Sequence, residues 1–123
     1  MDPLRCLAAP SPGGVTEAYV NPAQFCGIFA NDLPASEAAE LAATQEPIAA
    51  SALTEPSTAP AWATNPSWDV IGTADHAIPP AAQEFMAARA HAKVTKVDAS
   101  HLSMISHPGT VADVIEQAAR ATS

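Results

Sequence analysis

Residues 68–119 read WDVIGTADHAIPPAAQEFMAARAHAKVTKVDASHLSMISHPGTVADVIEQAA, and this stretch decides the fold. Residues 68–73 are mostly apolar and end at a turn, which predicts a strand. The Pro79-Pro80 pair starts a helix that we expect to run through Ala90. Residues 93–97 alternate polar and apolar side chains at a period of two, which predicts a second strand near a sheet edge.

A last helix is expected to begin at Pro108. Its apolar residues recur at helical spacing and form one face that we expect to pack on a sheet; they are Val111, Val114, Ile115, Ala118 and Ala119. The order strand, helix, strand, helix predicts a right-handed crossover with parallel strands. Functional groups of such sheets gather beyond the carboxyl ends of the strands. Asp75 follows the first strand and His101 the second, so both are expected at one sheet edge.

A carboxylate beside an imidazole is a chemically useful pair. The imidazole acts as a base near neutral pH, and the carboxylate fixes its tautomer and stabilises its protonated form. In this arrangement Asp75 accepts the ring N–H, while His101 takes a proton from a nucleophile. Gly72, three residues before the aspartate, is expected to let the strand end pass close to neighbouring backbone.

The segments GTADHAIPP and VDASHLSMISHP carry a family resemblance. They resemble the C-terminal part of an α/β-hydrolase, of the esterase-like kind that includes plant methylesterases and hydroxynitrile lyases. The resemblance implies a partial α/β-hydrolase fold in which Asp75 is the triad acid and His101 the triad base. It also implies an ester-like or related small carbonyl substrate, and it leaves hydrolase and lyase chemistry both open. Residues 15–64 are similar, more loosely, to the helical cap of these enzymes.

The sequence departs from the family in one respect, because it contains no Gly-x-Ser-x-Gly pentapeptide. Without a nucleophile, acyl transfer lacks its covalent step. We therefore expect a truncated hydrolase that is inactive alone, to which a complementing N-terminal part would supply the serine. The alternative is a non-catalytic remnant that binds partners or associates with itself through an exposed strand edge.

Proline and glycine positions divide the chain. Residues 1–14 contain three prolines and a Gly-Gly pair, which predicts a disordered leader. Residues 15–64 predict a helical cap segment with helices starting near Asn21-Pro22, Leu33-Pro34 and Glu46-Pro47. Residues 54–66 contain three more prolines and are expected to link this segment to the core portion at 65–123.

Composition excludes several classes of function. Thirteen acids oppose five bases, giving a net charge of −8, so nothing would attract a phosphate backbone and nucleic-acid binding is not expected. No basic start with an apolar run indicates a signal peptide, and no apolar stretch approaches about 18 residues, so no membrane span is expected. With two cysteines in all, we expect free thiols and a cytoplasmic protein.

Simpler interpretations stay open at this stage. Asp75 could be only a turn residue, and His101 only a loop residue held by backbone hydrogen bonds. A metal site would draw on Asp75, His76, His101 and His107, but their spacing is not that of a compact ligand set, so neither a metal nor a cofactor is expected. The remaining assignments are structural: Ser100 and Ser103 as hydrogen-bonding loop residues, Cys26 as a small buried residue, His76 facing solvent, His91 in a turn, His107 as a helix cap, and Trp62 and Trp68 at a pocket or at the joint between the segments.

Overall fold

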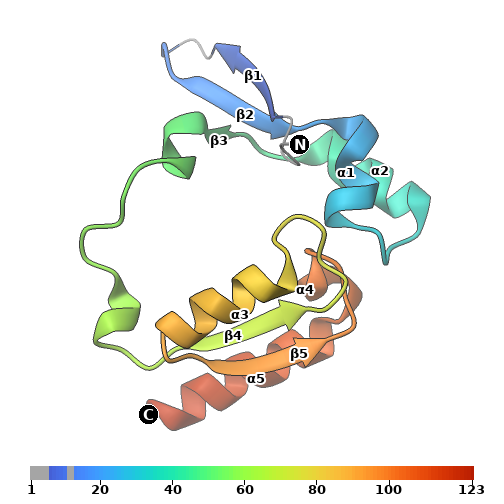
Figure 1. The fold of residues 1–123 in the computed structure, drawn as a ribbon. Helices are drawn as coiled ribbons and strands as arrows, with labels where there is room; N and C mark the ends of the chain where they lie inside the picture. The colour runs from blue at the N-terminus through green and yellow to red at the C-terminus, as the bar shows by residue number, and fades with distance from the viewer. Residues whose placement is uncertain (1–5, 11–12) are drawn as a thin grey trace.

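The structure is a computed structural model that describes residues 13–123 and, as backbone only, residues 6–10. Two parts follow each other along the chain: the cap segment, residues 15–64, and the C-terminal unit, residues 65–123. Figure 1 shows the cap segment's small sheet and helices above the C-terminal unit, with an extended linker joining the two on one side. Most linker residues are exposed, and a short 3-10 helix, η2, interrupts them at Ala61–Ala63.

The C-terminal unit has the expected order of strands and helices. Its elements are β4 (Trp68–Gly72), α3 (Pro80–Arg89), β5 (Lys93–Val97), the one-turn helix α4 (Ser103–Ser106) and α5 (Pro108–Ala121). β4 and β5 are parallel, with Trp68 opposite Lys93 and Gly72 opposite Val97. The predicted crossover unit is therefore confirmed, and the carboxyl ends of both strands lie at one edge.

Burial in this unit is concentrated on a few residues. Ile71 of β4 is completely buried, and Ala87 of α3 and Val114 of α5 are buried as well. The predicted apolar face of α5 is only partly covered, because Ile115 keeps 64% of its surface exposed. The two-stranded sheet is too narrow to cover a whole helix face.

The cap segment contains strands that the sequence interpretation missed. β2 (Thr16–Val20) pairs antiparallel with β1 (Cys6–Pro10) on one side and with β3 (Ile48–Ala49) on the other. We expected a disordered leader over residues 1–14, but residues 6–10 form a strand, and residues 1–5 and 11–12 lie outside the described residues. The Gly-Gly pair marks a turn between two strands, with Gly14 at a φ of 75°, a conformation that favours glycine.

Two of the three expected cap helices are present. α1 (Pro22–Phe29) starts at Asn21, whose side chain accepts a hydrogen bond from the amide of Ala23, and α2 (Ala35–Thr44) follows. The third is replaced by β3 and a 3-10 helix, η1 (Ala50–Leu53). Gln45 explains the difference, because its side chain accepts from the Val20 amide (2.8 Å) and donates to the Val20 carbonyl (2.9 Å). These two bonds hold the following residues extended beside β2.

A small core lies where α1 and α2 meet. Its buried members are Phe25, Ala30, Ala38 and Ala42. The rings of Phe25 and Phe29 stack with centroids 5.4 Å apart, an arrangement that adds about 0.5–1.5 kcal/mol to burial itself. Leu102 of the C-terminal unit packs against the same cluster, so the core also joins the two parts. Among the described residues, no helix is both long enough and apolar enough to cross a membrane.

Candidate active site

Asp75 lies in the turn after β4 and is 5% exposed. Its Oδ1 accepts hydrogen bonds from the amides of Ala77 (2.8 Å) and Ile78 (2.9 Å). Its Oδ2 accepts one from Nε2 of Gln83 (2.8 Å) and lies 2.9 Å from Nδ1 of His101. Both carboxylate oxygens therefore have fixed partners, and the side chain is held in one orientation.

His101 lies in the loop after β5 and keeps 29% of its side chain exposed. An ionised carboxylate only accepts hydrogen bonds, so Nδ1 of His101 carries a hydrogen and donates it to Asp75. In the neutral ring Nε2 is then unprotonated and available as a base. The ring of Phe29 meets the imidazole nearly edge to face, with centroids 4.6 Å apart at 75°. This contact fixes the plane of the imidazole from the cap segment's side.

The electrostatics of Asp75 reflect two opposing causes. Burial raises the pKa of this carboxyl, because the charged form loses hydration. Hydrogen bonds from His101 and from the amides of Ile78 and Ala77, together with the attraction of a protonated imidazole, lower it. The hydrogen bonds and the charge prevail, so the pKa of Asp75 lies below its usual value. The carboxylate is ionised at neutral pH and can accept the hydrogen bond from Nδ1 of His101.

Backbone contacts bring the ends of the two strands together. The amide of Thr73 donates to the carbonyl of Val97 (2.9 Å), and that of Ala74 donates to the carbonyl of Ala99 (3.1 Å). A Cβ added at Gly72 would stand 2.6 Å from the Ala99 carbonyl oxygen and 2.7 Å from that of Ser100. The close approach expected at Gly72 is therefore confirmed.

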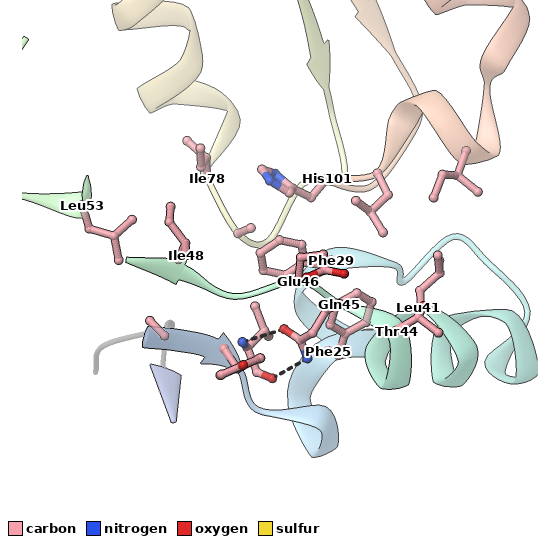
Figure 2. Close-up of a pocket in the computed structure, with 16 residues that line it drawn as sticks. Phe25, Phe29, Leu41, Thr44, Gln45, Glu46, Ile48, Leu53, Ile78 and His101 are labelled. Atoms are coloured by element: carbon pink, nitrogen blue, oxygen red, sulfur yellow. Dashed lines mark hydrogen bonds between the residues drawn. The ribbon is translucent and has the colours of Figure 1, made fainter. Parts of the chain in front are cut away.

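A cavity of about 540 Å³ opens beside His101. Figure 2 shows His101 and Ile78 of the C-terminal unit facing Phe29 and Ile48 of the cap segment. The wall also includes side chains of β2, α1, α2, the residues after α2, η1 and the C-terminal unit. They are Ala18, Tyr19, Val20, Phe25, Leu41, Thr44, Gln45, Glu46, Leu53, Ala77, Leu102 and Ile105. Most of these residues are apolar, and Glu46 is the acidic one among them. The cavity is within the usual size range of small-molecule sites, roughly 300–1,000 Å³.

Several expected structural roles are observed. Ser100 is 1% exposed and donates its hydroxyl hydrogen to Asp32, so it is a hydrogen-bonding loop residue. His91 lies in the turn before β5 with a φ of 52°, and His107 is the cap residue of α5, although its side chain makes no capping hydrogen bond. Within the described part of the chain, no group of three or more potential ligands could hold a metal ion.

Two assignments are wrong, those of Cys26 and Ser103. Ser103 begins α4 and is not a loop residue. Cys26 is an exposed free thiol, because the apolar face of α1 that turns inward carries Phe25 instead. His76 is exposed as expected, yet its Nδ1 also lies 3.0 Å from the Gly27 carbonyl oxygen.

Neither tryptophan lines the cavity beside His101. A cation covers each ring instead, Arg89 for Trp62 and Lys93 for Trp68, at 5.2 and 5.1 Å from the ring centroids.

Gln83 is a residue of the site that the sequence interpretation missed. Its Nε2 donates to Oδ2 of Asp75 (2.8 Å) and to the carbonyl of Ile78 (2.6 Å). The available signal was its position in the first turn of α3, eight residues after Asp75. A glutamine on an exposed helix is so common that this position alone did not single it out.

Comparison with known proteins identifies the family. A family model described as the alpha/beta hydrolase family matches residues 2–114. The chain belongs to the alpha/beta hydrolase family. No curated protein and no solved structure matches it. The match spans the cap segment and most of the C-terminal unit, so the parallel β4–β5 pair with its crossover helix is part of the α/β-hydrolase fold.

Proposed function

We propose that this chain supplies the base and the orienting acid of a hydrolase that acts on ester-like or related small carbonyl substrates. The observation that carries the proposal is the 2.9 Å contact between Nδ1 of His101 and Oδ2 of Asp75. The imidazole of His101 also lines an apolar cavity. Family membership supports the proposal, because the acid and the histidine of a Ser-His-Asp triad follow this chain order in α/β-hydrolases.

The proton transfers follow from the tautomer. Nε2 of His101 accepts the hydrogen of a nucleophilic hydroxyl as its oxygen bonds to the substrate carbonyl carbon, and the ring becomes an imidazolium. Asp75 stabilises that cation through Nδ1–H and does not itself take the proton. The imidazolium then donates the hydrogen from Nε2 to the oxygen of the leaving alcohol, as the single bond between that oxygen and the carbonyl carbon breaks. Such acid–base assistance is worth about 10²–10⁴ in rate.

The nucleophile is supplied, in this proposal, by residues outside the printed sequence. These 123 residues contain no Gly-x-Ser-x-Gly pentapeptide, although His101 and Asp75 are in contact. A carboxylate-bound histidine facing a cavity is arranged to receive a hydroxyl hydrogen from a residue placed across from it. We propose the cytoplasm as the compartment, where the Cys26 thiol would stay reduced.

The cavity indicates which substrates fit. Its wall is mainly aliphatic and aromatic, which favours substrates with an apolar acyl or alcohol group. Gln45 has its amide bound to the Val20 backbone, and Glu46 would repel an anion. Neutral esters with apolar groups are therefore the substrates that we propose, with lyase chemistry on a related small carbonyl compound as the alternative reaction.

Labelling by a fluorophosphonate, a probe of active serines, tests this function. The protein would be tagged in its native cells and purified with the residues or chains that naturally accompany it. Labelling of the purified material should fall at least ~100-fold in His101→Ala, by loss of the general base. His107→Ala is the matched control, because that imidazole does not line the cavity. Absence of label with the unaltered protein, or equal label in His101→Ala, would reject the proposal.

A second candidate is a non-catalytic module that associates with a second copy of itself. It is favoured by bare apolar surface on both helices that flank the sheet, where Phe85 of α3 is 69% exposed and Ile115 of α5 is 64% exposed. β4 also has a strand on one side only, among the described residues. Sedimentation equilibrium decides this point: a folded monomer over the whole accessible concentration range would exclude self-association.

A further inference from the structure

The turn between α1 and α2 contacts both loops of the candidate site. Nδ2 of Asn31 donates to the carbonyl of Ala74 (3.1 Å), the residue immediately before Asp75. The carboxylate of Asp32 accepts from the amide of Ser100 (3.0 Å), the residue immediately before His101. Two adjacent residues of the cap segment thus hold the two positions that precede the acid and the base.

The contact at Ser100 is double. Its hydroxyl donates to Oδ1 of Asp32, while its amide donates to Oδ2. Ser100 is almost fully buried, so both donors need an acceptor, and a carboxylate satisfies them with its two oxygens. An asparagine has one acceptor oxygen and would leave one of these donors facing an amide N–H group. Of aspartate and asparagine at residue 32, aspartate is the one with an acceptor oxygen for each of the two Ser100 donors.

Asp32 is ionised in this arrangement. Its partial burial favours the neutral form, but the hydrogen bonds from the hydroxyls of Ser100 and Ser106 and from the Ser100 amide outweigh burial and lower the pKa of Asp32. Hydrogen bonds to a charged acceptor are roughly twice as strong as those between neutral groups. The connection is therefore strong although Asp32 lies at the surface.

Two further bonds run alongside these. Nδ1 of His76, the residue after Asp75, lies 3.0 Å from the carbonyl oxygen of Gly27. The amide of Leu102, the residue after His101, donates to the carbonyl of Phe29 (3.2 Å). The acid and the base are thus each flanked on both sides by residues bonded to the cap segment.

We propose that Asn31 and Asp32 are positioning residues that fix the distance between Asp75 and His101, so that the cap segment controls whether the acid–base pair is formed. The catalytic meaning of this pair rests on the proposed function, but its geometry does not. Misplacement of a catalytic group by about 1 Å can cost 10²-fold in rate. Hydrogen bonds from the cap segment to both loops can therefore control the activity of the acid–base pair.

Proton NMR of the full chain tests the proposal without substrate or nucleophile. The Nδ1–H of His101 should give a low-field resonance, protected from exchange by its bond to Asp75. In Asp32→Asn this resonance should disappear or broaden while the dispersed amide signals of α3 and α5 remain. Asp113→Asn removes the same charge from an exposed position on α5 and should leave the resonance unchanged. A resonance as sharp in Asp32→Asn as in Asp113→Asn would overturn the proposal.

Milder variants keep the test decisive if Asp32→Asn fails to fold. Ser100→Ala removes the hydroxyl donor and leaves the amide bond, with Ser103→Ala as a control at a similarly buried serine. Asn31→Ala tests the other loop, with Asn65→Ala as a control, since Asn65 makes the same kind of backbone bond in the linker. Loss of the His101 resonance in Ser100→Ala and Asn31→Ala, but not in their controls, supports the proposal; its retention in both overturns it.

The two proposals fail in different ways. If the unaltered native protein takes no fluorophosphonate label, the hydrolase function is rejected, whereas the NMR comparison still decides whether Asn31 and Asp32 position the pair. If the label is present, Asp32→Asn should slow labelling about tenfold or more, in line with the cost of misplaced groups. Labelling of Asp32→Asn at the rate of Asp113→Asn would overturn the positioning role and leave the function standing.

Discussion

Gly72 and Ala99 are in direct backbone contact, so the end of β4 rests against the loop that leads to His101. The Ala99 carbonyl oxygen occupies the space that a side chain at residue 72 would need, at 2.6 Å from the position of a Cβ. The same carbonyl accepts the amide of Ala74, which anchors the turn before Asp75. The spacing of the acid and the base therefore depends on a residue that has no side chain.

Gly72→Ala should displace this loop. The methyl group would meet backbone atoms that have no flexible end to move, so we expect a loss of about 1–3 kcal/mol in the free energy of unfolding. Urea denaturation measures this loss. Gly109→Ala is the control, because nothing lies within 4 Å of a Cβ at that position in α5, and it should be neutral or slightly stabilising. Equal stability of the two variants would show that β4 does not need the close approach.

Asp75→Asn should change how stability depends on pH. The pKa of Asp75 lies below its usual value in the folded chain, so between the two values the unfolded chain binds more protons and stability rises with pH. This contribution is complete above about pH 4–5 and is lost as the pH falls through the folded pKa. The variant should lose less stability than the unaltered chain on acidification.

At neutral pH the same variant should be less stable. An asparagine would place an NH₂ group, or leave a single acceptor, among four donors, at a cost of about 1–3 kcal/mol. Thermal or urea unfolding from pH 7 to pH 2 measures both effects, with Asp113→Asn as the control. Parallel pH profiles for Asp75→Asn and the unaltered chain would contradict the assigned role of the hydrogen bonds.

The C-terminal unit could be predicted because its pattern is local. The alternation in residues 93–97 and the helical spacing after Pro108 each determine an element without reference to the rest of the chain. The cap segment could be predicted less well. β2 is five residues long and pairs with residues from a proline-rich leader, and β3 exists because Gln45 is bonded to the backbone of Val20, 25 residues earlier.

The site, like the fold, could be predicted only in part. Asp75 and His101 follow strands, so topology alone places them together, and the contact between them is observed. Asp32 and Gln83 do not follow a strand, so topology does not place them at the site. Asp32 reaches Ser100 across 68 residues of sequence, and Gln83 meets Asp75 because α3 folds back over the loop. Contacts of this kind depend on the packing of complete elements and leave no periodic trace in the sequence.

Gln83→Glu should disturb the pair electrostatically. A carboxylate in place of the amide would remove the donor to Oδ2 of Asp75 and place a like charge beside it, which raises the pKa of Asp75. The unfolding free energy at neutral pH should fall by about 1–3 kcal/mol. Carbon NMR of the Asp75 carboxyl during a pH titration measures the pKa directly. Gln117→Glu adds the same charge on exposed α5 and should leave that titration unchanged.

His91→Gly should stabilise the chain, although it removes a side chain. His91 follows the end of α3 and adopts a φ of 52°, in the left-handed region where a Cβ costs about 1–2 kcal/mol. Glycine relieves that cost but loses more backbone entropy on folding, about 0.5–1 kcal/mol, so a net gain of up to ~1.5 kcal/mol is expected. His107→Gly is the contrast, because His107 has a φ of −131° and gains no relief. Urea denaturation of both variants checks the sign: a loss of stability in His91→Gly as large as that in His107→Gly would mean that the turn after α3 carries no strain.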